Sequence, residues 1–561
     1  MILFQDEDLY YGYFKRFGGC FMLNVFTVSS LEKVFLDGDL QDENYNSFSL
    51  LQNEFGAFQL VVKSDEKLML EIKTESLLDV RCFEVKNIPA KKICNGGDDY
   101  YLRKAPGLYP DLLCECDELE ADENFRSLYF EVKAKKEKAG IYPVKVLLIN
   151  NGRILCEKTV NVEIIGAEIP EQKLICTHWF HTDCIHTYYD VPVFSEDYWR
   201  ITENFIKAAA EHGINLLLTP LFTPPLDTAI GKERPTVQLV DVSLEKGKYT
   251  FGFSKLHRWI EIAERNGIKY FEMSHLFTQW GAKHAPKIMA TVNGEYKQIF
   301  GWKTRAAGKK YTDFLRAFAK ELCAFLKKEG VEKQCFFHVS DEPSKKRIRY
   351  YGKRSALIRE LFGEFTIIDA LSDLEFYKKG LIKNPIPSIR SAEDFYGKVP
   401  ELWTYYCCGP DDGHYSNRFF GMPLQRTRVI GYQFYKYDVK GFLQWGLNFW
   451  YSQLSDHPIN PFETSDADGA FPAGDAFVLY PGEGGKPLAS IRFKAFREAL
   501  QDQRALQLLE SLIGREKTLA ILESDGEIKF NEYPMNAQWQ LKKREEINAA
   551  VKNAVSGAVV I

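Results

Sequence analysis

The 561-residue chain lacks the sequence signals of a membrane-inserted or exported protein. No uninterrupted apolar stretch reaches the ~18 residues of a membrane-spanning helix. The N-terminus, MILFQDEDLYYGYF, has no basic segment followed by a long apolar run, so it does not resemble a signal peptide. We therefore expect no membrane insertion and a cytoplasmic location, although a chain from which a leader had been removed would look the same.

Basic clusters and metal-binding motifs are also missing. The chain has 72 Lys and Arg against 77 Asp and Glu, a net charge of −5, and no basic patch that would indicate a nucleic acid or an anionic lipid surface. Of the 12 cysteines, only Cys114 with Cys116 and Cys407 with Cys408 are close in sequence, and neither spacing is a zinc or redox motif. The ten histidines form no H-E-x-x-H motif. The sequence predicts reduced thiols, no metal and no cofactor.

The composition provides ample material for hydrophobic cores. Hydrophobic residues make up 45% of the chain and charged residues 27%, as in ordinary globular proteins. The length exceeds the ~100–200 residues of a typical domain, so we expect two or three domains. Aromatic residues, at 14%, are frequent, which fits either sugar-stacking surfaces or a bulky core.

The first ~165 residues have the pattern of β-strands. Segments such as FGAFQLVVK and SLYFEVKAK are short and rich in β-branched and aromatic residues. Asn151-Gly152 separates VKVLLIN from ILCEKTVNVEII, and this pair favours a type I′ hairpin turn because both residues tolerate a positive φ. The pattern predicts an N-terminal β-sandwich domain over residues 1–168, followed by a linker around Pro170.

Beyond the linker, predicted helices alternate with predicted strands. DYWRITENFIKAAAEHG precedes INLLLTP, SKLHRWIEIAERNG precedes IKYFEMSH, YTDFLRAFAKELCAFLKKEG precedes VEKQCFFHVS, and KRSALIRELFG precedes EFTIIDA. Each predicted helix ends at a glycine, where a left-handed residue commonly terminates a helix; these glycines are Gly213, Gly267, Gly330 and Gly363. The repeated unit indicates a βα array.

The number of strands favours a barrel. The segments LICTHW, INLLLT, IKYFEM, QCFFHV, FTIIDA, ELWTYY, GFLQWG and AFVLYP make eight. They predict a (β/α)8 barrel with long βα loops over residues 169–515, closed by the helix PLASIRFKAFREALQDQRALQLLESLIG, and a mostly helical C-terminal extension over residues 516–561. A doubly wound sheet is the alternative, but THWFHTD after the first strand is not the glycine-rich turn typical of that fold.

The strongest candidate for chemistry is Asp341-Glu342-Pro343 at the end of the fourth predicted strand. Barrel enzymes carry their reactive groups at the C-terminal ends of strands, and glycoside cleavage needs an acid to protonate the leaving oxygen. The same residues also fit a helix start, because Asp is a good N-cap and Pro suits the first turn. Both interpretations stay open from these three residues alone.

Several further segments occur in the same order as in a known family. They are WFHTD, TPLFTPPLDT, SHLFTQWGAKHAPK, WTYYCCGP, LQWGLNFW and DADGAFPAGDAFVLYPG. With the Asp-Glu-Pro segment, they make residues 174–510 resemble glycoside hydrolase family 123, and the preceding β-domain agrees with that family's layout. The two acids show no departure from the family pattern.

The resemblance implies an exo-acting retaining β-N-acetylgalactosaminidase. In that family the 2-acetamido oxygen of the sugar attacks the anomeric carbon, so two adjacent acids suffice. Glu342 would be the general acid and then the general base, and Asp341 would accept the acetamide N–H. The implied substrate is a terminal β-linked N-acetylgalactosamine, as on glycosphingolipid oligosaccharides.

Other residues in the family-like segments are candidates for binding the substrate. We expect them to face the reactive end of the barrel, although each also fits a role in packing; they are His181, Asp183, His275, Gln279, Tyr405, Trp445 and Asn448. Two alternatives to the N-acetylgalactosaminidase stay open: hydrolysis of another sugar, such as β-linked N-acetylglucosamine, and a carbohydrate-binding protein without turnover. A glycan is the expected partner, and the sequence leaves the oligomeric state open.

Overall fold

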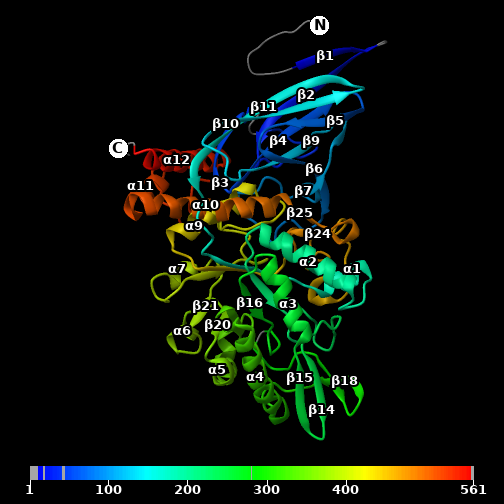
Figure 1. The fold of residues 1–561 in the computed structure, drawn as a ribbon, viewed down its shortest axis with the longest axis vertical. Coiled ribbons are helices and arrows are strands. Elements are labelled where there is room, and N and C mark those ends of the chain that lie inside the picture. The colour runs from blue at the N-terminus through cyan, green and yellow to red at the C-terminus, as the bar shows by residue number, and fades with distance from the viewer. Residues whose placement is uncertain (1–10, 17–18, 41–43, 280, 558–561) are drawn as a thin grey trace. The chain divides into compact units, whose positions relative to one another are not determined.

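The computed structural model describes residues 11–16, 19–40, 44–279 and 281–557, with side chains from residue 21 on (Figure 1). The chain divides into two compact units. The first contains residues 1–172, 412–436 and 488–561, and the second contains residues 173–411 and 437–487. The protein is therefore a multidomain α/β chain. None of the helices in the described ranges combines the length and the apolar character that crossing a membrane requires.

The first unit contains two β-sheets. One has the strand order β1-β2-β4-β9-β6-β7 and the other has the order β3-β11-β10-β5-β8. The strands are β1 (Tyr11–Arg16), β2 (Gly19–Ser29), β3 (Ser47–Gln52), β4 (Phe55–Ser64), β5 (Leu68–Glu75), β6 (Asp79–Ala90), β7 (Gly107–Glu115), β8 (Glu118–Ala121), β9 (Arg126–Lys133), β10 (Gly140–Asn150) and β11 (Arg153–Glu168).

The two sheets share one apolar core, as in a β-sandwich. Strand β4 illustrates the pattern, because Phe58, Leu60 and Val62 alternate along it and all enter this core together with residues of both sheets. The ring of Phe58 stacks on that of Phe130 in β9, with 5.0 Å between the centroids. The predicted hairpin is confirmed: β10 pairs with β11 up to Asn150 and Arg153, and Asn151 and Gly152 have φ values of 50° and 72°.

Among the described residues, five helices complete the first unit, and together they pack against both of its sheets. They are α8 (Leu424–Arg428), α9 (Ile430–Lys436), α10 (Ile491–Ile513), α11 (Arg515–Leu522) and α12 (Ala537–Val555). Leu424, Ile491 and Ala495 pack on a sheet surface that includes Ala57 and Phe83. Figure 1 shows α10 and α12 against the strands of this unit. The sequence had suggested that α10 closes the barrel, whereas its contacts are those of the first unit.

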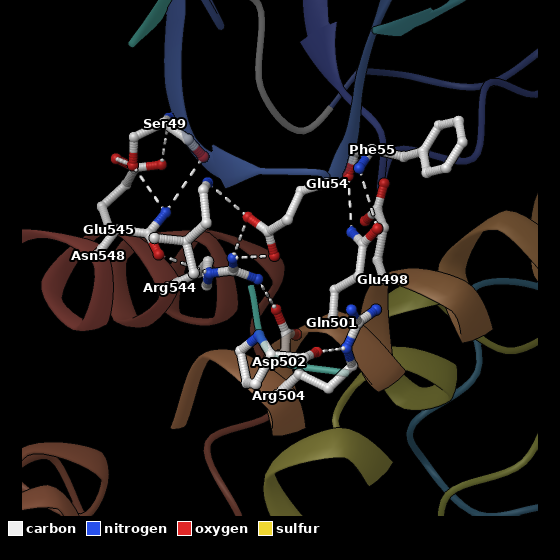
Figure 2. Close-up of polar contacts among 12 residues, drawn as sticks. Ser49, Glu54, Phe55, Glu498, Gln501, Asp502, Arg504, Arg544, Glu545 and Asn548 are labelled. Atoms are coloured by element: carbon white, nitrogen blue, oxygen red, sulfur yellow. Dashed lines mark hydrogen bonds and ion pairs between the residues drawn. The ribbon is translucent and has the colours of Figure 1, made fainter. Parts of the chain in front are cut away.

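Buried ion pairs connect these helices to the sheets (Figure 2). Arg544 of α12 binds both carboxylate oxygens of Glu54, at 2.5 and 2.6 Å, and also Oδ1 of Asp502 in α10 at 2.8 Å. The other carboxylate oxygen of Asp502 accepts from Arg428, whose Nη1 binds Glu498 at 2.6 Å. All five side chains are at most 7% exposed, so each charge depends on its partners for the solvation that water would otherwise supply.

The second unit contains eight parallel strands in two sheets, β12-β23-β22 and β13-β16-β19-β20-β21. Hydrogen bonds also join the edges of these sheets: Asn215 donates its N–H to the carbonyl of Cys176 at 3.1 Å, and Tyr405 donates to that of Pro387 at 3.1 Å. The strands are β12 (Ile175–His178), β13 (Leu216–Thr219), β16 (Tyr270–Met273), β19 (Cys335–His338), β20 (Thr366–Ala370), β21 (Asn384–Ile386), β22 (Trp403–Tyr405) and β23 (Gly441–Gln444).

One of the eight strand assignments made from sequence is wrong. The segment AFVLYP contributes β24 (Leu479–Pro481), which pairs with β25 (Pro487–Ala489) and belongs to neither parallel sheet. The parallel strand that sequence reasoning missed is β21, the three-residue segment Asn-Pro-Ile. Its proline cannot donate a backbone hydrogen bond and it contains no apolar run, so it carries no strand signal.

Helices connect most of these strands. They are α1 (Asp183–Tyr189), α2 (Glu196–Glu211), α3 (Ser254–Arg265), α4 (Lys309–Glu329), α5 (Ile348–Phe362), α6 (Glu375–Lys378) and α7 (Ala392–Phe395), with short 3₁₀ turns η1 (Glu332–Gln334), η2 (Lys345–Arg347), η3 (Gln453–Ser455) and η4 (Glu483–Gly485). The left-handed glycines predicted after three helices are confirmed at Gly213, Gly267 and Gly330. Gly363 instead has a φ of −66°, and a Cβ there would collide with the carbonyl oxygen of Arg359.

The long loops after β13 and β16 contain a sheet of their own. Its order is β15-β14-β17-β18, formed by β14 (Asp241–Glu245), β15 (Lys248–Gly252), β17 (Ile288–Val292) and β18 (Glu295–Phe300). Phe314 and Phe318 of α4 pack edge-to-face or tilted against Phe251 of β15, with centroids 5.7 and 5.3 Å away. These aromatic contacts hold the loop sheet on the helix that precedes β19.

The buried ion pairs of the first unit lead to a stability prediction. Replacing Arg544 by Met should lower the unfolding free energy of this unit by about 3–5 kcal/mol, because Glu54 would remain buried without its cation. The matched control is Lys552→Met on the same helix, since Lys552 pairs with Glu163 at 2.6 Å but is 54% exposed; it should cost at most about 1 kcal/mol. Hydrogen exchange of the α10 amides in increasing urea reports on this unit alone. Equal losses in the two variants would contradict the prediction.

Candidate active site

Asp341 and Glu342 follow strand β19 in a turn that hydrogen bonds hold in place. The backbone N–H groups of Val339 and Ser340 donate to Oδ1 of Asp369 at 2.9 and 3.1 Å. The N–H of Glu342 donates to the carbonyl of Ala370 at 3.0 Å. Glu342 has a φ of 40°, a left-handed conformation that is uncommon for a residue with a side chain. The end of β20 therefore fixes the backbone that carries both acids.

The alternative interpretation of Asp341-Glu342-Pro343 as a helix start is wrong. Helix α5 begins at Ile348, preceded by a 3₁₀ turn over Lys345–Arg347. Asp341 lies several residues before this turn and caps neither element. The two acids instead line an open cavity with a volume of about 130 Å³.

The cavity wall is made of carboxyl, aromatic and small neutral side chains. Five of the residues predicted from the sequence line it, namely Gln279, Asp341, Glu342, Tyr405 and Trp445. The others that line it are Trp179, Leu226, Asp227, Ala370, Cys407, Cys408, Leu443 and Phe471. Among the described residues of the wall, none is Lys, Arg or His.

The environment of Asp341 favours its protonated form. Burial raises the pKa of Asp341 well above its usual value, and the neighbouring Glu342 and Asp369 carboxylates raise it further. The phenol of Tyr405 donates a hydrogen bond to Oε1 of Glu342. Because burial and the neighbouring carboxylates both disfavour its ionised form, Asp341 can hold a proton next to Glu342. A proton held beside a cavity is what a general acid requires.

Asp227, in the loop after β13, is a cavity residue that sequence reasoning missed. Its N–H donates to Oε1 of Gln279 at 2.5 Å, and its carbonyl accepts from Ser455 Oγ at 2.6 Å. These bonds hold its backbone at a φ of 45°. Oδ2 is buried without a hydrogen-bond partner in the described part of the chain, and burial raises the pKa of Asp227 to about 6. Only its place in TPPLDT, an acid within a family-like segment, could have singled it out.

A buried ion cluster lies behind the acid pair. Nε2 of His338, in β19, donates to Glu272 at 2.7 Å, and its Nδ1 lies 3.4 Å from Asp369. Burial alone would lower the pKa of His338, but the hydrogen bonds to Asp369 and Glu272 raise it to about 9. His338, Asp369 and His275 are close enough together to hold a metal ion. At neutral pH the raised pKa keeps the imidazole of His338 protonated, so that both of its nitrogens carry protons next to the two carboxylates.

The two tryptophans of the wall are held by buried carboxylates. Nε1 of Trp179 donates to Glu272 at 2.8 Å, and Nε1 of Trp445 donates to Asp475 at 3.0 Å. The ring of Trp445 also meets that of Phe471 edge-to-face, with centroids 5.4 Å apart. Fixed indole rings at a cavity offer flat apolar faces on which a sugar can stack.

Four of the residues predicted to bind the substrate do not line the cavity. His275 is buried and stacks on His338, with 4.1 Å between the ring centroids. The other three form one hydrogen-bonded group with Arg234, and they are His181, Asp183 and Asn448. Sequence reasoning placed them near the reactive end of the strands but could not tell which way their side chains point.

This hydrogen-bonded group holds the backbone of Trp445 in place through His181. Arg234 donates to both carboxylate oxygens of Asp183, at 2.8 and 2.6 Å, and to Nδ1 of His181 at 3.1 Å. Burial and the Arg234 charge lower the pKa of His181 to about 3, so the ring is neutral. Its Nε2–H then donates to the carbonyl of Trp445 at 2.8 Å. The amide of Asn448 bonds both the N–H and the carbonyl of His181, at 2.9 and 3.1 Å.

Comparison with known proteins gives the family. A model of the glycoside hydrolase 123 catalytic domain matches residues 179–509, more than half of the chain. The chain belongs to glycoside hydrolase family 123. It is thus a member of a family of glycosidases, and the matched range contains every residue of the cavity wall.

A solved structure agrees with this assignment. A family 123 glycoside hydrolase from Clostridium perfringens, from a study of glycolipid glycan hydrolysis, has a TM-score of 0.72 at 14% identity, covering 95% of this chain and 98% of that one. A family 39 glycoside hydrolase from Bacteroides cellulosilyticus has a TM-score of only 0.30 at 11% identity, covering 77% and 80%, and supports no argument. No curated protein is similar enough to this family 123 chain to count as a match.

The raised pKa of His338 predicts a pH dependence of stability. A histidine with a pKa near 6.5 in the unfolded chain and about 9 in the folded one contributes on the order of 3 kcal/mol below pH ~6.5, and this contribution is lost as the pH rises through 9. In His338→Gln the decline between these pH values should be absent. Urea unfolding of both proteins at pH 6, 7.5 and 9 measures it. A parallel decline in the two proteins would show that His338 is not the group responsible.

Proposed function

We propose that this family 123 enzyme is an exo-acting retaining β-N-acetylgalactosaminidase that removes terminal residues from glycosphingolipid-type oligosaccharides. The observation that carries the proposal is the cavity wall, in which the adjacent acids Asp341 and Glu342 stand among aromatic rings and no described residue is cationic. Cleavage of a glycoside passes through a transition state with positive charge at the anomeric carbon. An anionic, aromatic cavity suits that charge.

In the proposed mechanism the two acids have different roles. Tyr405 occupies Oε1 of Glu342, which leaves Oε2 to donate a proton to the glycosidic oxygen. The 2-acetamido oxygen of the sugar attacks the anomeric carbon as the bond to the leaving group breaks. Asp341, whose proton has passed to Glu342 within the acid pair, accepts the acetamide N–H and stabilises the positive charge of the oxazolinium. Glu342, now ionised, removes a proton from the water that opens this intermediate.

The competing mechanism uses Asp227 as its nucleophile. This residue is the third carboxyl group of the wall, and with a pKa of about 6 it is largely ionised at pH 7. In our proposal the carboxylate of Asp227 accepts a hydrogen bond from a sugar hydroxyl. In the competing mechanism Asp227 attacks the anomeric carbon and forms a covalent ester, as in other retaining glycosidases.

We also propose that the eight parallel strands form one closed (β/α)8 barrel. Support comes from the backbone hydrogen bonds that join the edges of the two sheets, from Asn215 to Cys176 and between Tyr405 and Pro387. In a barrel the active site lies at the C-terminal ends of the strands. Asp341 follows β19 and Tyr405 ends β22, which places both at that end. The domain boundaries after residues 168 and 515 stay predictions.

The first functional prediction concerns Glu342. The unmodified chain should release the phenol from an aryl β-N-acetylgalactosaminide. Glu342→Gln should lower kcat/KM by about 10²–10⁴ for substrates with poor leaving groups, and much less for activated aryl glycosides, which need no acid. Parallel assays on methylumbelliferyl and oligosaccharide substrates measure the difference. Equal losses on both would show that Glu342 is not the acid.

The same assay tests the alternative functions. Aryl β-N-acetylglucosaminide serves as the comparison substrate, since it differs only in the configuration at C4. Faster turnover of this sugar would replace the proposed substrate but keep the mechanism. No turnover of either sugar, with measurable binding of the oligosaccharide, would favour a carbohydrate-binding protein.

The second functional prediction concerns the nucleophile. A thiazoline analogue of the oxazolinium should bind at least about 100-fold more tightly than free N-acetylgalactosamine, because it resembles the transition state. Asp341→Asn should weaken the thiazoline more than the free sugar. Weak binding of the thiazoline, together with a glycosyl ester on Asp227 detected by peptide mass spectrometry, would support the competing mechanism.

A further inference from the structure

Two consecutive cysteines, Cys407 and Cys408, line the same cavity as the acids. They follow strand β22 directly after Tyr405 and Tyr406. Both are half-buried, both are reduced, and their thiols hydrogen-bond to each other. Two neighbouring thiols that line a cavity can together chelate a ligand, and the proposed hydrolysis does not use them.

The two cysteines lie near the acid pair. The hydrogen bond with Cys408 and burial raise the pKa of the Cys407 thiol well above its usual value. The carboxylates of Glu342 and Asp475 are close enough to the thiol to raise this pKa further. Tyr405, two residues earlier, donates to Glu342. A group bound to both sulfurs would therefore occupy the space beside the proton donor.

A direct disulfide between these residues is unfavourable. Consecutive Cα atoms across a trans peptide are about 3.8 Å apart, whereas disulfides prefer about 4.4–6.8 Å. The described part of the chain contains no cis peptide. A bridging atom between the sulfurs relieves this constraint, because two bonds to a third atom allow the sulfurs to stay further apart than one S–S bond does.

We propose that Cys407 and Cys408 form a dithiol site that binds trivalent organoarsenicals, and that a bound arsenical blocks the cavity. An arsenoxide, R–As=O, reacts with two thiols to give R–As(S–Cys)₂ and water. Two S–As bonds form, the bonds between arsenic and oxygen break, and both thiol protons leave with the oxygen. Arsenic remains trivalent, so no oxidant is needed. The inhibition, though not the binding, rests on the proposed hydrolase function.

A second pair of cysteines provides the matched control. Cys82 in β6 and Cys116 after β7 also hydrogen-bond through their thiols, and the N–H of Cys116 donates to the carbonyl of Cys82 at 3.1 Å. Both belong to the first unit and neither lines the cavity. An arsenical bound there would change the mass of the protein without entering the active site.

The experiment treats the intact chain with phenylarsine oxide and measures mass and activity together. The wild-type protein and Cys82→Ser/Cys116→Ser should lose at least about tenfold in rate, because the second S–As bond forms within the protein at high effective concentration. A 1,2-dithiol should restore the rate and a monothiol should not. The double variant Cys407→Ser/Cys408→Ser should keep its own untreated rate after treatment. It should also bind one arsenical fewer than the wild-type protein.

Three outcomes would overturn the proposal. One is undiminished inhibition of Cys407→Ser/Cys408→Ser; another is full sensitivity of the single variant Cys407→Ser, which would show that one thiol suffices. The third is an unchanged number of bound arsenicals in the double variant. If the chain hydrolyses no substrate, the loss of one arsenical from the double variant still supports the site, while the proposed function alone fails.

Discussion

The carboxylate of Asp369 is the group on which the geometry of the candidate active site depends. One oxygen accepts the N–H groups of Val339 and Ser340, and the other accepts the phenol of Tyr351 at 2.6 Å. The same carboxylate neighbours the imidazolium of His338. These contacts set the path of the chain as it leaves β19, and so they decide where Asp341 and the strained Glu342 point. Removing this carboxylate would leave two backbone donors buried without a partner, at a cost of about 1–3 kcal/mol each.

Buried charges also fix the local geometry of the first unit. Arg544 and Asp502 would each be costly to bury alone, and together with Glu54 they form a chain of ion pairs. Such a network adds little stability compared with apolar residues of equal size, but it penalises every arrangement in which one member lacks its partner. The positions of α10 and α12 on the sandwich are therefore specified by charge as well as by the apolar contacts around Leu506 and Ile547.

The sequence predicted what depends on local pattern. Alternating strands, the Asn151-Gly152 turn and the acids after β19 follow from periodicity, turn preference and position, and the structure has them in place. It could not reveal β21, whose residues carry no strand signal, nor Asp227, whose exposure to the cavity depends on contacts with Gln279 and Ser455. His181 carries the same chemical groups whether it faces a ligand or a neighbour, and its orientation depends on Arg234, more than fifty residues away.

The negative charge of the cavity wall is the structural feature that best suits the proposed reaction. Three carboxyl groups line it, and among the described residues of its wall no cation balances them. Burial, together with the repulsion between these carboxylates, raises the pKa of Asp341 well above its usual value. As the glycosidic bond breaks, the anomeric carbon becomes positive and supplies the missing charge. In the proposed mechanism Asp341 then interacts with the transition state more strongly than with the neutral substrate, and only such a difference accelerates a reaction.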